Sequence, residues 1–503
     1  MQMHLKKIGR LLALYRVLFV RQSFFYKFSL NRSPGFLGSS KFMADPWIGD
    51  HKTGQEIMDN GLDVTDVRYR DYITSFSWIR DLQVIGGNNN RKYARMLISS
   101  FISSYRQQKQ FWLDTSTWNN VIVAERVVNW IFSYSFFASG ANDRFQMEVL
   151  SSITEQFSHL EKIYNAEFNP FARLMILRAI LFCYCSSNTS HTKRARKILR
   201  KIREVIDDYV DDNGMFFSES PVDHFHVFRS LLEIRFVAKN AGLDISEEGF
   251  TSKLSKMAAV VRFFRLCDGS ILSHYGTTSV FTPSKQMIDT ALSIVDVKAP
   301  SVKPYGFERL ETKKSTVIIN TKPRSSASKF NDEFGPGINI FDFELSFGQD
   351  KIFDMADIVV ALNGCRIKLN DSARCFSKKS MKGDLIFFES ETQFNNRFFD
   401  FALRREIDLS ISKQRLTCSD FLLASLSMEG SLRFVFNRDT DVRRVSKKSI
   451  LVIVNKHEYM FSIVDGDIMD VMVSRSQEPI MEISYLLGTK KEQKIVWSIE
   501  SVE

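Results

Sequence analysis

The sequence predicts a two-part α+β chain, in which an all-helical half precedes an antiparallel β half. Apolar residues recur every three or four positions across residues 72–268, which is the period of an α-helix. Beyond a proline-containing segment at residues 299–304 they alternate instead, which is the period of a β-strand. We therefore expect a basic helix with an extended arm (1–70), a helical domain (71–298) and a β domain (305–503).

The composition is that of an ordered globular protein. The chain has 503 residues, 44% of them hydrophobic and 25% charged, which suits two domains with sizeable cores. A net charge of +10 attracts polyanions such as nucleic acid, acidic lipid or uronate-rich glycan without distinguishing among them. The six cysteines show no CxxC spacing, and no GxGxxG, P-loop, HExxH or GxSxG motif occurs. We therefore expect no disulfide framework, no metal and no cofactor.

The first 50 residues combine a basic amphipathic stretch with an extended arm. Residues 5–20 are too short and too charged to span a bilayer, and no small-residue cleavage site precedes Arg21. We therefore expect no cleaved signal peptide. We expect the protein in the cytoplasm, either free or associated with a membrane. The stretch could lie on anionic lipid, or pack on the main body through its leucines. Residues 33–50 are rich in Gly, Pro and Ser and carry Trp47, which favours an extended segment lying across a later surface.

Helical stripes follow one another with short connections, as in an array of antiparallel helical hairpins. Periodicity alone fits a bundle, an open solenoid or a closed ring equally well. Residues 194–203 (RARKILRKIR) place cations on most faces of one helix. That helix could grip a polyanion, or it could be a solvated helix with a narrow apolar stripe.

The second half reads as short β-prone runs between residues 316 and 499. Residues 348–350 and 465–467 have the composition of tight turns between such runs. The pattern predicts an antiparallel sandwich or a barrel-like sheet.

Residues 211–234 are the most informative stretch for function. A turn at residues 211–214 and a break at Pro221 are followed by helical spacing, with Asp223, His224 and His226 in the first turns. Polar groups delivered to a helix N-terminus favour anions, because the first amides are unpaired there. The plain alternative is a helix-loop-helix with surface histidines.

This stretch resembles the heparinase II/III type of polysaccharide lyase found in bacteria. Asp212 to Gly214, Ser220, Pro221 and His224 fit the family's pattern, although its Glu is displaced by one position to Glu219. Further similarities follow in the family's order: FSWIRDL at 76–82, RVVNW at 126–130, RFFR at 262–265, YGFERL at 305–310, FDFEL at 341–345 and QKIV at 493–496. The resemblance implies an (α/α) toroid followed by an antiparallel β-sandwich, with a sugar cleft between them.

The resemblance also implies a chemistry. Such lyases break the bond beside a uronic acid by β-elimination, in which a base removes the proton next to the carboxylate and an acid protonates the leaving oxygen. The carboxylate must first be neutralised by an amide, an imidazole or a cation. The implied partner is an acidic polysaccharide rather than nucleic acid.

Carried over residue by residue, the family's pattern gives two sets of candidates. The catalytic candidates are His224, His226, Glu219 and Asp223, and the substrate-binding candidates are Asn169, Arg126, Asn339 and Asn363. Asp223 occupies the family's tyrosine position, and the two sheet-domain histidines fall near Asn339 and at Asn363. Asn169 could neutralise a carboxylate or could be a turn residue before Pro170. Only His457 supplies an imidazole after residue 304.

Three hypotheses follow. The chain is a divergent lyase that cleaves uronate-containing glycans, with impaired or altered activity; or it is a catalytically silent glycan-binding or scaffold protein on the lyase fold; or it is a peripheral membrane protein whose N-terminal basic helix carries its function. The missing imidazoles favour the second.

Overall fold

The computed structural model describes residues 25–30, 37–62, 70–114, 116–217, 220–243, 247–272, 282–295, 302–322, 340–362, 365–366, 374–395, 400–437, 439–475, 479–489 and 492–502. The basic stretch at residues 5–20 lies outside these ranges. No helix among the described residues is long and apolar enough to cross a membrane.

The chain divides into two compact units. The helical unit comprises Met1–Ser218, Asp223–Ala258 and Thr278–Pro300, and the sandwich unit comprises Glu219–Val222, Ala259–Thr277 and Ser301–Glu503. The chain therefore enters the sandwich unit first at Glu219–Val222 and again within the helix α13 (Glu247–Phe264), and it returns to the helical unit for α14 (Lys285–Ile294). The division into residues 1–70, 71–298 and 305–503 that the sequence predicts stays a prediction.

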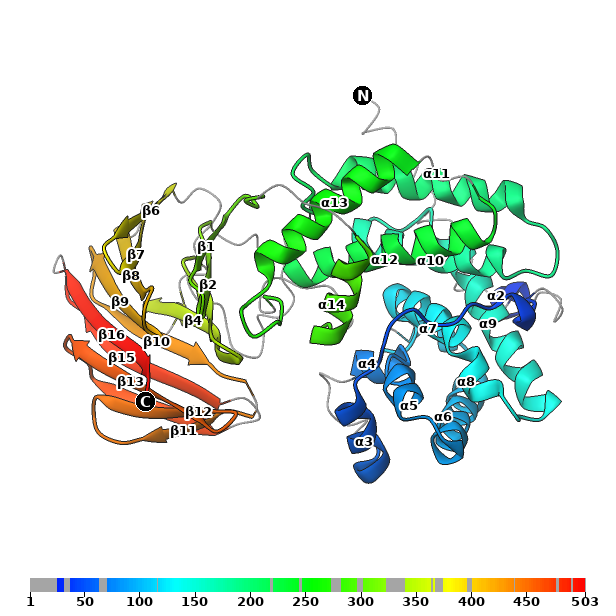
Figure 1. Ribbon diagram of the computed structural model, residues 1–503, viewed down its shortest axis with the longest axis horizontal. Coiled ribbons are helices and arrows are strands. Elements are labelled where there is room, and N and C mark those ends of the chain that lie inside the picture. The colour runs from blue at the N-terminus through cyan, green and yellow to red at the C-terminus, as the bar shows by residue number, and fades with distance from the viewer. Residues whose placement is uncertain are drawn as a thin grey trace. The chain divides into compact units, whose positions relative to one another are not determined.

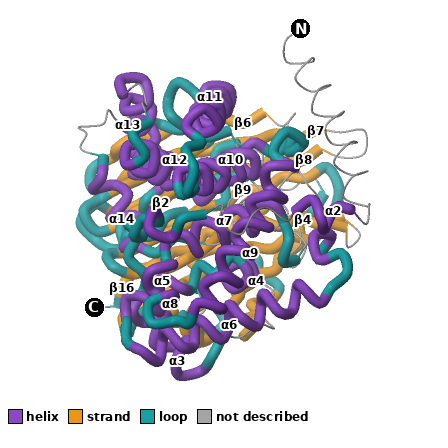
Figure 2. Tube along the Cα trace, turned by 90° about the vertical axis from the view of Figure 1, so that its right-hand side faces the viewer, coloured by secondary structure: helices purple, strands orange, loops and turns teal. Residues whose placement is uncertain are grey.

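The helical unit is an (α/α) toroid, as the family resemblance implied (Figures 1 and 2). Its α-helices are α2 (Phe25–Leu30), α3 (His51–Asn60), α4 (Arg70–Thr74), α5 (Ile79–Ile85), α6 (Asn88–Gln107), α7 (Asn120–Phe132), α8 (Tyr134–Ala138), α9 (Asp143–Ile163), α10 (Pro170–Cys185), α11 (Thr192–Tyr209), α12 (Pro221–Asn240), α13 (Glu247–Phe264) and α14 (Lys285–Ile294). Short 3₁₀ helices occur at Ser39–Lys41 and Phe111–Leu113.

Two kinds of helix build this unit. Helices α7 and α10 are buried along almost their whole length, and α12 is buried from Pro221 to Ile234. Helix α11 instead buries a single stripe, and the first half of α9 (143–151) buries only Val149. Helix α7 contacts α9, and α10 contacts α11. A helix that is apolar all round must be covered on every side, whereas an amphipathic helix needs covering on one side only. The first kind is therefore internal and the second external.

The predicted arm lies across this unit, which confirms the expectation for its described part. Leu37 pairs with Ser187 in an isolated bridge, and the backbone amide of Gly38 donates to the carbonyl of Ser186. Further along, Gly49 approaches so closely that a Cβ atom there would lie 2.2 Å from the carbonyl oxygen of Arg80. Only glycine allows this contact, so the end of the arm is fixed against α5.

The sandwich unit contains two antiparallel sheets, and the prediction of an antiparallel sandwich is confirmed (Figure 1). One sheet has the order β1-β2-β3-β4-β10-β15-β14 with β5 paired to β4, and the other has the order β11-β12-β13-β16-β9-β8-β7-β6. The strands are β1 (Phe307–Glu311), β2 (Ser315–Asn320), β3 (Phe343–Phe347), β4 (Asp350–Leu362), β5 (Cys365–Arg366), β6 (Arg374–Lys382), β7 (Leu385–Asn395), β8 (Asp400–Ser410), β9 (Arg415–Ala424), β10 (Met428–Val435), β11 (Asp441–Arg444), β12 (Ser449–Val454), β13 (His457–Asp465), β14 (Asp470–Arg475), β15 (Pro479–Leu487) and β16 (Gln493–Ser501).

A single apolar core joins the two sheets. Strands such as β8 and β9 alternate buried and half-buried positions, as expected for strands with one face on a core. Trp497 lies at the centre, with its ring centroid 4.9 Å from that of Phe434 and 5.3 Å from that of Phe461. The hairpin between β12 and β13 turns at Asn455 and Lys456, whose φ angles of 49° and 74° are typical of a two-residue type I′ turn.

Candidate functional site

Five of the eight predicted site residues lie in the described part of the chain, and all five belong to the helical unit. They are Arg126 on α7, Asn169 before α10, and Asp223, His224 and His226 on α12. Glu219, Asn339 and Asn363 lie outside the described residues.

His224 is fully buried and both of its ring nitrogens are engaged. Nδ1 accepts a hydrogen bond from the backbone amide of Phe216 at 3.2 Å, and Nε2 lies 3.1 Å from the carbonyl oxygen of Met257. Since that oxygen can only accept, Nε2 carries the proton and donates. Burial lowers the pKa of His224 to about 4. The side chain therefore holds the segment before α12 and α13 together as a neutral imidazole, rather than lying on the surface as the plain alternative expected.

Asp223 and His226 are also buried, with 0% and 2% of their surfaces exposed. The ring of His226 packs edge-on against Phe225 at a centroid distance of 5.8 Å. His226 also lies close enough to Glu125 to help lower the pKa of that carboxyl group. These two residues therefore belong to the interior of the helical unit.

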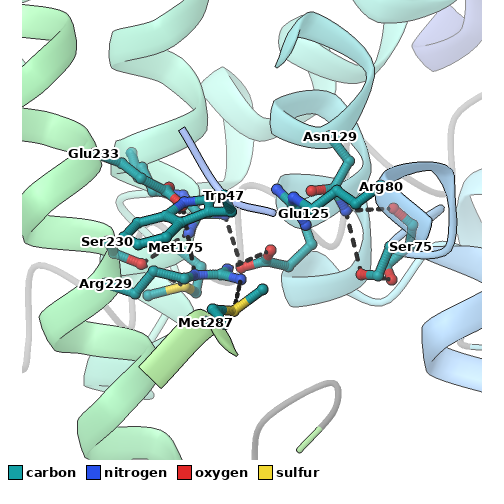
Figure 3. A network of polar contacts seen from close by, with 12 residues as sticks. Trp47, Ser75, Arg80, Glu125, Asn129, Met175, Arg229, Ser230, Glu233 and Met287 are labelled. Carbon is teal, nitrogen blue, oxygen red and sulfur yellow. Dashed lines mark hydrogen bonds and ion pairs between the residues drawn. The ribbon is translucent and has the colours of Figure 1, made fainter. Parts of the chain in front are cut away.

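Arg126 holds backbone carbonyl groups in place. Its Nη1 donates to the carbonyl oxygens of Thr74 at 2.8 Å and Thr117 at 3.0 Å, and its Nε donates to Gln156. Three residues along the same helix, Asn129 donates to the carbonyl of Ser75 at 2.9 Å (Figure 3). The motif at residues 126–130 therefore clamps the loop that begins the motif at residues 76–82.

Asn169 caps α10. Its side-chain oxygen accepts from the backbone amides of Phe171 at 2.9 Å and Ala172 at 3.2 Å, with Pro170 in the first helical position. Asparagine followed by proline is a strong helix-start signal, because the cap satisfies free amides and proline has no amide to satisfy. This geometry matches the turn-residue interpretation of Asn169.

Charged side chains with little or no exposed surface form a cluster inside the helical unit, here called the Glu–Arg cluster: Glu125, Arg178, Arg229 and Glu233. Figure 3 labels Glu125, Arg229 and Glu233. Glu125 accepts from Arg178 at 2.7 Å and from Arg229 at 2.9 Å. Glu233 pairs with the same arginines, at 3.1 Å to Arg178 and 3.4 Å to Arg229. Burial raises the pKa of Glu125, but the two arginines outweigh it and lower the pKa to about 2. Glu125 is therefore ionised between the two guanidinium groups.

The arm covers this cluster with two inward-pointing side chains. The indole nitrogen of Trp47 donates to Glu233 at 2.6 Å, and the carboxylate of Asp45 accepts from Nε of Arg80. Arg80 is only 4% exposed, and its two terminal nitrogens have no hydrogen-bond partner among the described residues. Burial raises the pKa of Asp45, although Arg80 opposes it. Figure 3 shows Trp47 beside Glu233 and Arg229.

A second polar arrangement lies in the sandwich unit, centred on buried Asp350. Its carboxylate accepts from Asn455 at 2.8 Å and from the hydroxyl of Tyr459 at 2.6 Å, and lies 2.7 Å from Nδ1 of His457. Burial raises the pKa of Asp350, but these hydrogen bonds outweigh it and lower the pKa below its ordinary value. The side chain of His457 is 65% exposed. Because Nδ1 is held by the carboxylate, Nε2 is the nitrogen that a neutral ring presents to a proton donor.

Sequence reasoning overlooked both arrangements, although signals for them exist. Charges on helices that are otherwise apolar all round indicate paired buried ions, since an unpaired charge is too unfavourable there. His457 and Tyr459 are two residues apart on one strand, so they share a face. Among the described side chains, no group of three or more His, Cys, Asp or Glu residues could hold a metal ion.

Comparison with solved structures places the fold among heparinases. The chain is similar to heparinase III with a TM-score of 0.58 and 11% identity, over 92% of this chain and 83% of that one. It is also similar to the heparan sulfate lyase HepC from Pedobacter heparinus, with a TM-score of 0.48 and 15% identity, over 98% of this chain and 88% of that one. No protein-family model and no curated protein matches the sequence. At 11% identity, the similarity to heparinase III shows a heparinase-like fold.

Proposed function

We propose that this chain binds a uronate-containing acidic polysaccharide on a heparinase-like fold, without using His224 to cleave it. The class of ligand is supported by the similarity to a structure named heparinase III and by the net charge of +10, which attracts polyanions. The proposal that His224 takes no part in cleavage rests on its placement, because both of its ring nitrogens are bonded inside the core.

The predicted catalytic residues are poorly suited to β-elimination. A general acid or base works best with a pKa near the working pH, whereas the pKa of His224 is about 4. A carboxylate at Asp223 repels a uronate rather than protonating its leaving group. Asn169 caps α10 through its side-chain oxygen, which makes it no proton donor or acceptor for the elimination itself. Binding without elimination by these groups is therefore the function that the geometry supports best.

The test combines binding with turnover on the same glycans. Calorimetric titration with heparin, chondroitin and alginate should give binding to at least one of them. Incubation with the same panel should give no new unsaturated uronate ends, which are detected by their ultraviolet absorbance. Turnover by the wild-type chain that disappears in His224→Gln would show that His224 does transfer protons. Absence of binding to every glycan would refute the ligand class.

The Asp350 arrangement favours a second candidate, a lyase in which His457 removes the proton. Its imidazole is oriented by a buried carboxylate while most of the ring faces solvent. If the wild-type chain produces unsaturated ends, His457→Ala should abolish them and Asp350→Asn should lower the rate and shift its pH profile. His51→Ala is the matched control, because it removes an exposed imidazole from α3. Turnover that survives His457→Ala would remove this candidate.

A further inference from the structure

Helix α11 exposes a row of cations on the surface of the helical unit, here called the basic face: Lys193, Arg194, Arg196, Lys197, Arg200 and Arg203. The opposite side of the helix buries Ala195, Ile198, Ile202, Val205 and Ile206, and the helix contacts α10. Figures 1 and 2 both place α11 at the outer side of α10. The cations therefore point away from the core.

The order of charges along α11 opposes the helix dipole. The first turn has no acidic residue and the last turn has no basic one, while Glu204, Asp207 and Asp208 lie near the C-terminal end. Cations are unfavourable at the positive N-terminal end of a helix, and anions are unfavourable at the negative C-terminal end. This arrangement therefore lowers the stability of the isolated helix.

Like charges are also neighbours on the helix surface. Lys193 and Lys197 are four residues apart, as are Arg196 and Arg200, and like charges at this spacing repel each other. In the part of the chain that the structure describes, these four side chains and Arg194 make no hydrogen bond or ion pair. Because these five cations have no ion-pair partner in the described part of the helical unit, an external anion would relieve the repulsion between them.

The composition of the basic face distinguishes among polyanions. The only aromatic residue of α11 is Tyr209, at its last position, so the face offers no ring on which a nucleic acid base could stack. The apolar residues lie on the buried side, with Leu199 half-buried, so none is placed to enter a lipid surface. Lys193 and Arg203 are about 15 Å apart along the axis, given the rise of an α-helix. A chain with carboxylate or sulfate groups at regular intervals meets these requirements.

We propose that the basic face of α11 is a docking surface for an acidic polysaccharide, separate from any site of cleavage. The identity of the polymer rests on the proposed function, whereas the existence of the surface rests on α11 itself. Docking there adds a second attachment for a long chain, which raises its affinity through effective concentration. Salt screens this contribution, because the cations are exposed.

The decisive comparison uses two variants with the same change in net charge. The test variant is Lys193→Gln/Lys197→Gln/Arg200→Gln, and the control is Lys378→Gln/Lys447→Gln/Lys448→Gln, which removes three exposed lysines of the sandwich unit. We expect the test variant to bind long-chain heparin about tenfold more weakly than the control at low salt, with the difference vanishing at high salt. Equal affinities of the two variants would overturn the proposal.

A second measurement separates docking from a structural role. Because the substitutions relieve repulsion and an unfavourable dipole interaction, the test variant should unfold at the same or a higher temperature than the wild-type chain. A lower Tm would mean that the cations stabilise the fold, and would contradict the proposal.

Two further probes test the occupant. The difference in affinity between the test variant and the control should be smaller for duplex DNA and for phosphatidylserine vesicles than for heparin. A larger loss of binding to either probe would overturn the assignment to polysaccharide. If the wild-type chain binds no acidic glycan at all, the proposed function fails as well; if it binds one and both variants bind equally, only the docking surface fails.

Discussion

At the scale of single residues, His224 and Asn169 have chemical groups that suit catalysis and positions that suit folding. His224 joins the amide of Phe216 to the carbonyl of Met257, and Asn169 closes the first turn of α10. The sequence placed both next to turns and prolines, and such places need hydrogen-bonding side chains for structural reasons. A catalytic role and a structural role are therefore distinguished by the hydrogen-bond partners of the side chain, and not by the residue type.

The low pKa of His224 predicts a pH dependence of stability. The unfolded imidazole takes up a proton near pH 6.5, whereas the folded one resists it until about pH 4. Stability is therefore complete above pH 6.5 and declines as the pH falls toward 4, by about 3 kcal/mol from this residue.

Urea unfolding of the wild-type chain and of His224→Gln across this pH range measures the effect. Glutamine can offer one donor and one acceptor in place of the imidazole but does not titrate, so the difference between the two slopes isolates His224. Parallel curves for the two proteins would show that His224 is not buried as a neutral ring.

At the scale of elements, the inner helices and the arm depend on one another. Helices α7, α10 and α12 carry the Glu–Arg cluster, whose charges are buried and therefore need partners in fixed positions. The arm adds Trp47 and Asp45 from outside the ring. The contacts of Trp47 with Glu233 and of Asp45 with Arg80 therefore contribute to the stability of the helices beneath the arm.

Trp47→Phe should lower the free energy of unfolding by about 2 kcal/mol. The substitution keeps most of the apolar contact but removes the hydrogen bond to the buried Glu233 carboxylate. Ile48→Ala is the control on the same arm, since Ile48 is 55% exposed and should matter little. Similar losses for the two variants, measured by urea unfolding, would mean that the arm acts by general contact rather than through Trp47.

Glu125→Gln should be more damaging, with a loss of about 3–5 kcal/mol. The amide leaves Arg178 and Arg229 with uncompensated charge in the core, because only Glu233 remains between them. Thermal unfolding should show a large fall in Tm at neutral pH. A fall no larger than that of an exposed control such as Glu148→Gln would contradict the assignment of paired buried charges.

At the scale of the whole molecule, much of the architecture could be predicted from periodicity. The change from a helical to a strand period indicated the order of the two halves, and Gly and Asp marked the turns before β4 and after β13. Whether the helices form a ring or a bundle depends on contacts between distant helices, so the family resemblance was needed to choose.

The candidate site was harder to predict, because its residues were taken from motifs that turn out to hold the fold together. Arg126 and Asn129 bind the carbonyls of the loop at residues 74–78, so two motifs that look independent in the sequence are one packing unit. The pairing of Glu125 with Arg178 and Arg229 depends on three helices meeting, so it leaves no spacing signal, unlike the pair of Arg229 and Glu233 four residues apart on α12. His457 was not among the candidates, because it lies outside the motifs in which the family has its histidines. Its partner Asp350 lies more than a hundred residues away in the sequence, so no local pattern joins the two.

The most direct test of this account follows the imidazole nitrogens of His224 by NMR in ¹⁵N-histidine-labelled protein, with His224→Gln identifying the signals. We expect a neutral ring protonated at Nε2 from pH 8 down to about pH 5, unchanged when heparin is added, since the pKa is about 4. A ring that titrates between pH 6 and 7, and whose nitrogen signals shift on adding heparin, would contradict it and restore His224 as a proton-transfer group.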